Sequence, residues 1–485
     1  MTTMLEAPVL APPAADVERK DRRWLGLFAV LAAMIMNLLD ATVVNVAAPS
    51  IRAELGGSYA SLQWIAAGYT LALAVGLLTG GRLGDMYGRK RMMTAGVVGF
   101  LVTSVACAAA WSPATLVGAR VLQGLCAAVM IPQAFGLVRD LFPPREIGKA
   151  FAAFGPVIGG STILGPIVAG LLVDADVFGS GWRMIFLINV PLGLFALLAG
   201  LRALPAVPPS ARNTRLDLTG ALLAGVGMFL LVYPLVQGRE LGWPAWTFVM
   251  LAGSVAVLAA FAVQQLRRRR AGGVPLVELS VFTRRSYTSG VAFVVVFFGA
   301  VVGFSLAVGL FLQLGLGYSP MRASLTMAAW AVGAFLGSGF AVAMMAKLGR
   351  RILHLGLALM ATGVAGVYLV FQAVGAEVGT AHLITPLVIF GFGMGMIFVP
   401  LFDIIMGEVE DHEVGSAAGA LESLQQLGAS LGVAVLGTVF FGVVGQQLAL
   451  DVWVDAAKWT ALLTLGLTGL AFALGFLLPR KARAH

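Results

Sequence analysis

The chain has 485 residues, of which 59% are hydrophobic and only 11% are charged, and its formal net charge is +9. Soluble globular proteins are roughly 45–50% apolar and about 25% charged, so a soluble fold of this length would lack the polar groups to cover its surface. The basic residues lie mostly in short segments between apolar runs, and this excludes the clustered basic face that nucleic-acid binding requires. The composition therefore indicates an all-α integral membrane protein.

Long apolar runs follow one another along the chain. A helix needs about 20 mainly apolar residues to cross the hydrocarbon core of a bilayer, and by this criterion we predict fourteen spans. The first 23 residues contain prolines and end in ERKDRR, which predicts a disordered tail, and 479–485 forms a second tail. The predicted spans lie near 24–50, 60–80, 92–110, 113–138, 150–173, 184–204, 216–236, 245–266, 286–314, 321–346, 352–374, 380–406, 416–445 and 457–478.

The Lys and Arg residues predict the direction of the spans, because cytoplasmic loops are enriched in them. With the N-terminus placed inside, 26 of the 32 Lys and Arg residues fall on cytoplasmic segments and 5 fall outside. The remaining one, Arg120, lies within a predicted span. We therefore expect both termini in the cytoplasm, with the chain in the cytoplasmic membrane.

The turn at 80–91, GGRLGDMYGRKR, is the predicted cytoplasmic turn between the second and third spans. An ordinary positively charged loop explains its basic residues, but it does not explain the carboxylate or the regularly spaced glycines. A carboxylate there can face a helix end and hold two spans in one relative position. We interpret the turn as a conformational latch made by Gly81, Asp85, Gly88, Arg89 and Lys90.

These residues, together with Leu83, resemble the loop 2–3 motif of the major facilitator superfamily at every usual position. Fourteen spans in place of twelve narrow the resemblance to the 14-helix drug:proton antiporter branch. The resemblance implies two six-helix bundles, at 24–204 and 286–478, and a linker at 205–285 that carries two additional central helices. Members of this branch expel lipophilic, often cationic, drugs in exchange for protons, and some expel an antibiotic made by the host.

Five further stretches are similar to that branch and occur in its order. They are LLDATVVNVAAPSI at 38–51, LVGARVLQG at 116–124, GGSTILGPIVAG at 159–170, WRMIFLINVPLG at 182–193 and GSAAGALESLQQLGASLGVAVLG at 415–437. The third departs from the pattern, because Ala169 stands where a glycine is usual. The resemblance assigns the antiporter motif to Gly160, Gly165, Pro166 and Gly170, although generic packing of small residues explains the glycines too.

Two ionisable residues at membrane depth carry the main chemical hypothesis, because such residues are costly there. At 1.5 Å per residue, Asp40 lies about 15 Å and Arg120 about 10 Å below the outer ends of their spans. The pair either fixes helix packing permanently or exchanges a proton during transport. Burial favours the neutral carboxyl and a nearby cation favours the ionised one. We expect Asp40 to bind and release a proton, with Arg120 as its modulator.

The predicted second bundle offers two further carboxylates for proton coupling. Asp403 lies about 6 Å from the inner boundary, where a solvated interfacial carboxylate is equally consistent. Glu422 lies about 9 Å inside, among small residues that favour close helix approach. Polar and aromatic residues of the spans are candidates for binding a small lipophilic substrate, although each is also explained by packing: Asn37, Asn45, Trp64, Tyr69, Gln133, Gln313, Trp330 and Gln426.

Other classes of membrane protein leave signatures that the sequence lacks. None of the six lysines is followed by Ser or Thr, so there is no phosphate-binding loop of an ATP-driven pump. The four histidines are scattered and the two cysteines lie in apolar runs, which argues against a membrane enzyme and a metal site. We expect a monomer without a cofactor, driven by the proton gradient through alternating access. A dedicated self-resistance exporter and an exporter of a lipid or metabolite remain alternatives.

Overall fold

The computed structural model describes residues 14–143, 146, 150, 153–176, 179–208, 216–273, 275–406, 409, 414–445 and 449–479. In this part of the chain all regular secondary structure is helical. Thirteen segments are long and apolar enough to cross a membrane, and Leu164–Ala175 is a shorter apolar helix. The predicted all-α, multi-pass membrane architecture is therefore confirmed.

The helices follow the predicted spans closely. The first half contains α1 Ala14–Leu55, α2 Tyr59–Tyr87, α3 Arg89–Ala108, α4 Pro113–Leu141, α6 Phe154–Ala175, η2 Gly181–Arg183, α7 Met184–Leu187 and α8 Asn189–Ala203. Two helices, α9 Leu218–Gln237 and α10 Ala245–Arg270, lie in the predicted linker. The second half contains η3 Leu279–Thr283, α11 Arg285–Leu310, η4 Phe311–Gly315, α12 Pro320–Leu348, α13 Arg351–Val374, η5 Gly375–Glu377, α14 Thr380–Met406, α15 Val414–Val444 and α16 Leu450–Gly475.

Three ends differ from the prediction. Helix α2 continues to Tyr87 and does not end near 80, so most of the predicted turn at 80–91 is helical and only Gly88 separates α2 from α3. Helix α1 begins at Ala14, so the predicted disordered tail at 1–23 is wrong for its last ten residues, 14–23. That segment, AADVERKDRR, contains good helix formers and no Gly or Pro, which allows the helix to continue beyond the membrane. The last span was predicted to begin near 457, after Asp451 and Asp455. Acidic residues are favourable near the N-terminus of a helix, and α16 begins at Leu450.

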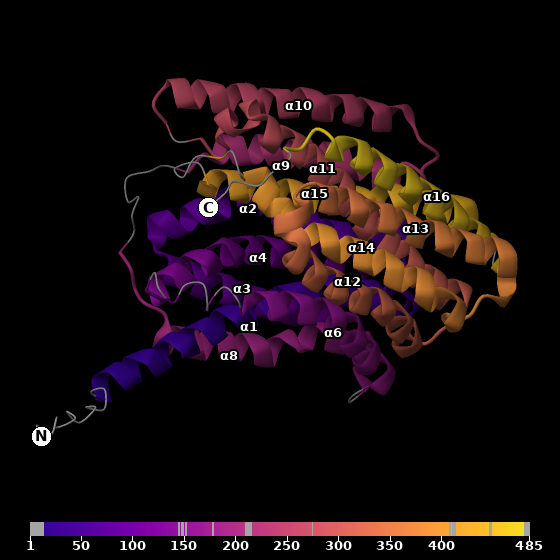
Figure 1. Ribbon diagram of the computed structural model, residues 1–485, viewed down its shortest axis with the longest axis horizontal. Helices are drawn as coiled ribbons and strands as arrows, with labels where there is room; N and C mark the ends of the chain where they lie inside the picture. Colours follow the sequence, from indigo (N-terminus) through magenta and orange to yellow (C-terminus); the bar gives the residue numbers. More distant parts are fainter. Residues whose placement is uncertain are drawn as a thin grey trace, which may run out of the picture.

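Figure 1 shows the helices of the first half packed side by side, next to those of the second half. Helices α2 and α15 run antiparallel along one seam between the halves. At one end of this seam, the rings of Tyr59 and Phe441 stack with centroids 4.2 Å apart. Farther along, Ser423 Oγ donates a 2.6 Å hydrogen bond to the carbonyl of Ala74. Helices α6 and α12 form the second seam, where Met321 N donates to Asp174 Oδ2 at 3.1 Å.

Helices α9 and α10 form a hairpin outside the two bundles, with α10 at the edge of the molecule (Figure 1). Only 11% of the most apolar 18-residue stretch of α10 is buried, so most of this helix is available to lipid. Helix α9 packs against both α2 and α15, and Thr438 Oγ1 of α15 donates to the carbonyl of Leu235 at 2.7 Å. Buried Asp217 caps α9 and accepts a 2.7 Å hydrogen bond from Gln265 of α10. These contacts tie the hairpin together at the base of α9.

The predicted sixth span consists of two helical segments with a nearly continuous backbone, because Ile188 between them has helical φ and ψ of −58° and −26°. Helix α7 ends at Leu187 and α8 begins at Asn189. Pro191 lacks the backbone N–H that would bond to the carbonyl of Leu187, so the helix loses a hydrogen bond at this point. Asn189 lies where this hydrogen bond is missing and is fully buried.

Candidate functional site

The structure brings Asp40 of α1 and Arg120 of α4 into direct contact. Arg120 Nη1 donates to Asp40 Oδ2, and the two side chains are 1% and 0% exposed. The same Nη1 donates to Gln123 Oε1 at 2.7 Å, and Arg120 Nε donates to the carbonyl of Ile65 at 3.2 Å. The guanidinium is therefore held by α1, α2 and α4 together.

The second oxygen of Asp40 is bound by two amides. Gln123 Nε2 and Asn189 Nδ2 each donate to Asp40 Oδ1 at 3.0 Å. Both amides also donate to Ser104 Oγ of α3, at 2.9 and 3.3 Å. The ion pair thus lies at the centre of a polar network that joins five helices of the first half.

Sequence reasoning did not single out Gln123, Asn189 or Ser104. Gln123 follows Arg120 by three residues, a spacing that places both on one helix face and is a usable signal. Asn189 is a polar residue two positions before a proline in an otherwise apolar span, which is a weaker signal. Ser104 gives no signal, because single serines are common in membrane helices.

Aromatic rings cover the guanidinium. The Tyr69 ring centroid lies 4.1 Å and the Phe186 centroid 5.8 Å from Arg120 Cζ, within the range of cation–π attraction. Tyr69 OH donates to Asn37 Oδ1 at 2.6 Å, so two residues predicted to bind substrate contact each other beside the ion pair. With water excluded, removal of the Asp40 charge would leave Arg120 buried without its counter-ion. Each charge of the pair therefore depends on the other to remain buried.

The turn after α2 makes its polar contacts to several helices. Arg89 Nη1 lies 3.1 Å from Asp140 Oδ1 of α4, and Arg89 Nη2 lies 3.9 Å from Asp85 Oδ1. Lys90 Nζ donates to the carbonyls of Leu201 and Leu204, at 2.9 and 2.7 Å, at the end of α8. The turn therefore connects α2, α3, α4 and α8.

Two glycines of the turn have different surroundings. Gly88 has a φ of +94°, which a side chain would disfavour, and its N–H closes α2 by donating to the carbonyl of Gly84 at 2.8 Å. Gly81 faces Pro132 of α4 without close contact, since a Cβ there would lie 3.8 Å from Pro132 Cβ. The backbone of the turn thus depends on Gly88 more strongly than on Gly81.

The side chain of Gln133 connects α4 to the end of α2. Its Nε2 donates to the carbonyls of Gly80 and Val129 at 2.9 and 3.0 Å. A Cβ at Gly84 would overlap the Gln133 amide, so the side chain fills the space that this glycine leaves. Gln133 stays a candidate for substrate binding, and in this structure its N–H groups join α4 to α2 and to its own helix.

The predicted antiporter motif lies on α6 where this helix meets its neighbours. A Cβ at Gly165 would overlap Thr42 of α1, and one at Gly170 would lie 2.8 Å from Met321 Cα of α12. Pro166 lies between them inside α6. Gly160 belongs to α6, but its surroundings are outside the described part of the chain. The glycines of the motif therefore permit α6 to pack closely against α1 of the first half and against α12 of the second half.

The candidates of the second half are spread over several helices. Half-buried Glu422 of α15 accepts a 3.1 Å hydrogen bond from Gln426 Nε2, one turn later. Asp403 belongs to α14, but its side chain lies outside the described residues. Gln313 is buried in the π-helical turn η4, a rare geometry that is frequent at functional sites. Among the described side chains, Glu422 and Gln313 make no hydrogen bond or ion pair with Asp40 or Arg120.

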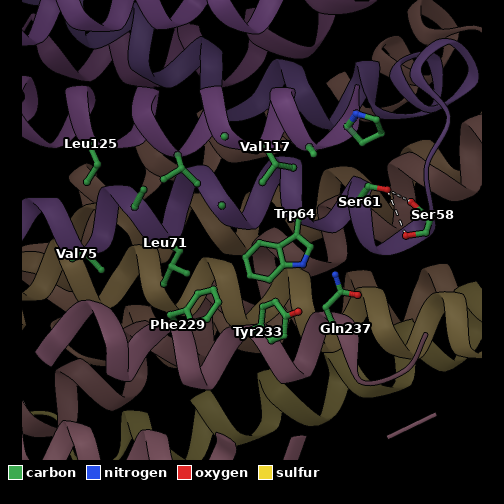
Figure 2. A pocket seen from close by; sticks show the side chains of 16 residues that line it. Ser58, Ser61, Trp64, Leu71, Val75, Val117, Leu125, Phe229, Tyr233 and Gln237 are labelled. Atoms are coloured by element: carbon green, nitrogen blue, oxygen red, sulfur yellow. Dashed lines mark hydrogen bonds between the residues drawn. The ribbon is translucent and has the colours of Figure 1, made fainter. Parts of the chain in front are cut away.

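Trp330, Asn45 and Trp64 have separate environments. Trp330 packs on Phe390, with ring centroids 4.6 Å apart, and its Nε1 donates to Met394 Sδ at 3.3 Å. These contacts hold Trp330 against α14, and its role toward a substrate stays a prediction. Asn45 is half-buried on α1. Trp64 lines an open-sided groove of about 770 Å³ between α2, α4 and α9 (Figure 2).

Apolar helices in two packed halves, with a charged pair buried at membrane depth, define a multi-pass membrane transporter. Residues 30–433 match the Major Facilitator Superfamily, and the chain belongs to this family.

Solved structures of low sequence identity share the fold. A bacterial homologue of the human lysosomal transporter Spinster, in an inward-facing conformation, has a TM-score of 0.67 at 16% identity, over 94% of this chain and 97% of that one. The nucleoside transporter NupG has a TM-score of 0.63 at 14% identity, over 93% of this chain and 99% of that one.

Sequence relatives are more similar. A protein of Streptomyces coelicolor named "Probable actinorhodin transporter" is 49% identical over 432 residues, which are 89% of this chain and 75% of the relative. The puromycin resistance protein pur8 of Streptomyces alboniger is 36% identical, over 94% of this chain and 90% of the relative. The tetracenomycin C resistance and export protein of Streptomyces glaucescens is 34% identical, over 90% of this chain and 79% of the relative.

Proposed function

We propose that this transporter exports a lipophilic, cationic antibiotic or drug across the cytoplasmic membrane of a bacterium in exchange for protons. The names of the sequence relatives support export of an antibiotic. The excess of Lys and Arg on one set of loops supports an orientation with both termini in the cytoplasm. The observation that carries the proton coupling is the fully buried Asp40–Arg120 pair.

In this proposal Asp40 is the proton carrier of the first half. When Arg120 moves away, burial of the unpaired Asp40 carboxylate favours proton uptake. When Arg120 returns, its positive charge favours release of the proton from Asp40. Gln123 and Asn189 support both states, because an amide can donate through its nitrogen or accept through its oxygen. Within the described residues Asn189 Oδ1 is buried without a hydrogen-bond partner, so an acceptor for a protonated Asp40 is already close by.

The gradient supplies the energy in this scheme. One charge that crosses the membrane gains about 2.3 kcal/mol per 100 mV, which supports accumulation of a substrate against its gradient. The two halves alternate around a site near the midplane, as in other transporters built from repeated bundles. Glu422 and Asp403 are further carboxylates for a proton or for a substrate cation, and no resident cofactor takes part.

A narrower function is also supported. The relative at 49% identity is named for transport of one compound, and two others are named for resistance to, or export of, one compound. Efflux and proton flux in proteoliposomes, measured with a panel of cationic, neutral and anionic compounds, distinguish the two functions. We expect proton-linked transport of several lipophilic cations. Transport of a single compound would favour the dedicated exporter, and transport of anions alone would contradict the cationic substrate.

The turn at 80–91 is proposed to latch the cytoplasmic side closed when the transporter opens outward. Asp85→Asn removes a charge that is about one third exposed, and such pairs contribute about 0.2–1 kcal/mol. We therefore expect turnover to fall up to about fivefold, with substrate affinity close to that of the parent. Equilibrium binding and initial transport rates, measured on the same preparation, separate the two quantities. A loss of binding at unchanged turnover would place Asp85 in the substrate pocket instead.

A further inference from the structure

An open-sided groove of about 770 Å³ lies on the flank of the first half, away from the ion pair. Figure 2 shows side chains of α2, such as Leu71, between those of α4, such as Leu125, and those of α9, such as Phe229. The inserted helix α9 therefore supplies one wall of the groove. Trp64 of α2 packs against Phe229 and Tyr233 of α9, with centroids 6.3 and 5.7 Å away, and this cluster keeps the wall in place.

The α4 wall is open because its residues are small. Ala114 and Gly118 line the groove and are exposed, and a Cβ at Gly118 would have no neighbour within 4 Å. Leu125 is 41% exposed on the same wall. These residues lie on a helix that crosses the membrane, so the open side of the groove faces lipid.

The polar groups of the groove gather at one end. Figure 2 shows the indole nitrogen of Trp64, the hydroxyl of Tyr233 and the amide of Gln237 grouped together, close to Ser58 and Ser61. Ser61 Oγ donates to the carbonyl of Ser58 at 2.7 Å. The side chains of Trp64, Tyr233 and Gln237 have no hydrogen-bond partner among the residues that the structure describes. Three hydrogen-bonding groups are therefore available beside an otherwise apolar surface.

The length of the apolar part matches one leaflet of a bilayer. The eleven-residue step from Trp64 to Val75 along α2 corresponds to about 16 Å at 1.5 Å per residue. Half of a hydrocarbon core of about 30 Å is about 15 Å. In the orientation proposed above, the polar end lies near the outer surface and the apolar end near the midplane. This arrangement has the polarity and the length of one phospholipid chain in the outer leaflet.

We propose that the groove is a binding site for an outer-leaflet phospholipid. One acyl chain lies along Leu71, Val75, Leu125 and Phe229, and an ester oxygen accepts hydrogen bonds from Trp64, Tyr233 or Gln237. No charged side chain lines the groove, so it offers nothing to neutralise a cationic substrate. The bound chain fills the gap between α4 and α9 and supports the contact of the inserted hairpin with the first half.

The test uses the full-length transporter in proteoliposomes that contain phosphatidylglycerol with a photoreactive diazirine on one acyl chain. After illumination, mass spectrometry maps the labelled peptides. We expect labelling of the groove peptides of α2, α4 and α9 to exceed that of the exposed face of α10. Gly118→Leu places a side chain in the groove at a position where a Cβ has no neighbour within 4 Å, and it should reduce this labelling severalfold. Gly466→Leu on α16, where a Cβ also has no neighbour within 4 Å, is the matched control.

The polar end has its own variant. Trp64→Phe, Tyr233→Phe and Gln237→Leu combined remove three hydrogen-bonding groups and keep most of the shape. At about 0.5–1.5 kcal/mol for the hydrogen bond to the ester oxygen, the loss corresponds to a labelling decrease of about two- to tenfold. Groove labelling equal to that of α10, and unchanged in Gly118→Leu, would overturn the proposal. Displacement of the label by a transported compound would also overturn it, because the groove would then be a substrate site.

Discussion

Replacement of Asp40 by Asn is expected to abolish drug-dependent proton movement. Asn keeps the size of the side chain and still accepts a hydrogen bond from Arg120, but it carries no titratable proton. The folded transporter should persist with a lower Tm, because breaking a buried ion pair costs roughly 3–5 kcal/mol and the remaining hydrogen bond offsets part of this. Proton flux is measured with a pH-sensitive dye inside proteoliposomes upon addition of substrate, and Tm on the same purified protein.

The double variant Asp40→Asn/Arg120→Gln separates coupling from stability. It removes both charges, so no buried charge is left without a partner, and Tm should return toward that of the parent. Proton coupling should stay absent. If the double variant recovers coupled transport together with its Tm, the pair serves only to hold α1 and α4 together. If Asp40→Asn alone still couples transport to protons, another carboxylate carries the proton, and Glu422 is the first to examine.

Replacement of Gly391 by Ala is expected to cause the largest loss of stability in the second half. Helices α12 and α14 cross at this glycine, and a Cβ there would overlap the carbonyl oxygen of Trp330. The obstacle is backbone, so a side-chain rotation cannot relieve it and the two helices must separate. Overpacking of a core typically costs 1–3 kcal/mol, and we expect the upper part of that range. The measurement is Tm and the yield of monodisperse protein in detergent.

Gly339→Ala on α12 is the matched control, because a Cβ at Gly339 has no neighbour within 4 Å. Alanine is the better helix former, so this variant should be at least as stable as the parent. A Tm of Gly391→Ala equal to that of Gly339→Ala would mean that α12 and α14 do not pack closely in the folded transporter.

The spans were predictable from sequence because each requires a long apolar run, and charge placed at membrane depth is rare enough to stand out. Asp40 and Arg120 were found in this way, although they are 80 positions apart in the chain. Their amide partners were not found, because the rotation of one span relative to its neighbours is set by packing. Asn189 illustrates this, since it lies 149 positions from Asp40 in the chain and meets it only because the sixth span presents this face to α1.

The same limit applies to the predicted substrate residues. Gln133 and Trp330 are polar or aromatic residues within spans, as a binding residue would be, and sequence cannot separate the two cases. Their neighbours were not predictable either: Gln133 joins α4 to Gly80, and Trp330 packs on Phe390. The position of α9 was likewise beyond prediction, because an apolar helix of 20 residues carries no sign of which seam it covers.

The most direct test of proton exchange at Asp40 compares transport with and without a pH difference across the membrane. Proteoliposomes are loaded with a lipophilic cation, and its movement is followed with the membrane potential clamped to zero by valinomycin and equal potassium. We predict that an imposed pH difference drives uphill movement of the cation in the parent and none in Asp40→Asn. Equal movement of the compound with and without the pH difference would contradict the account.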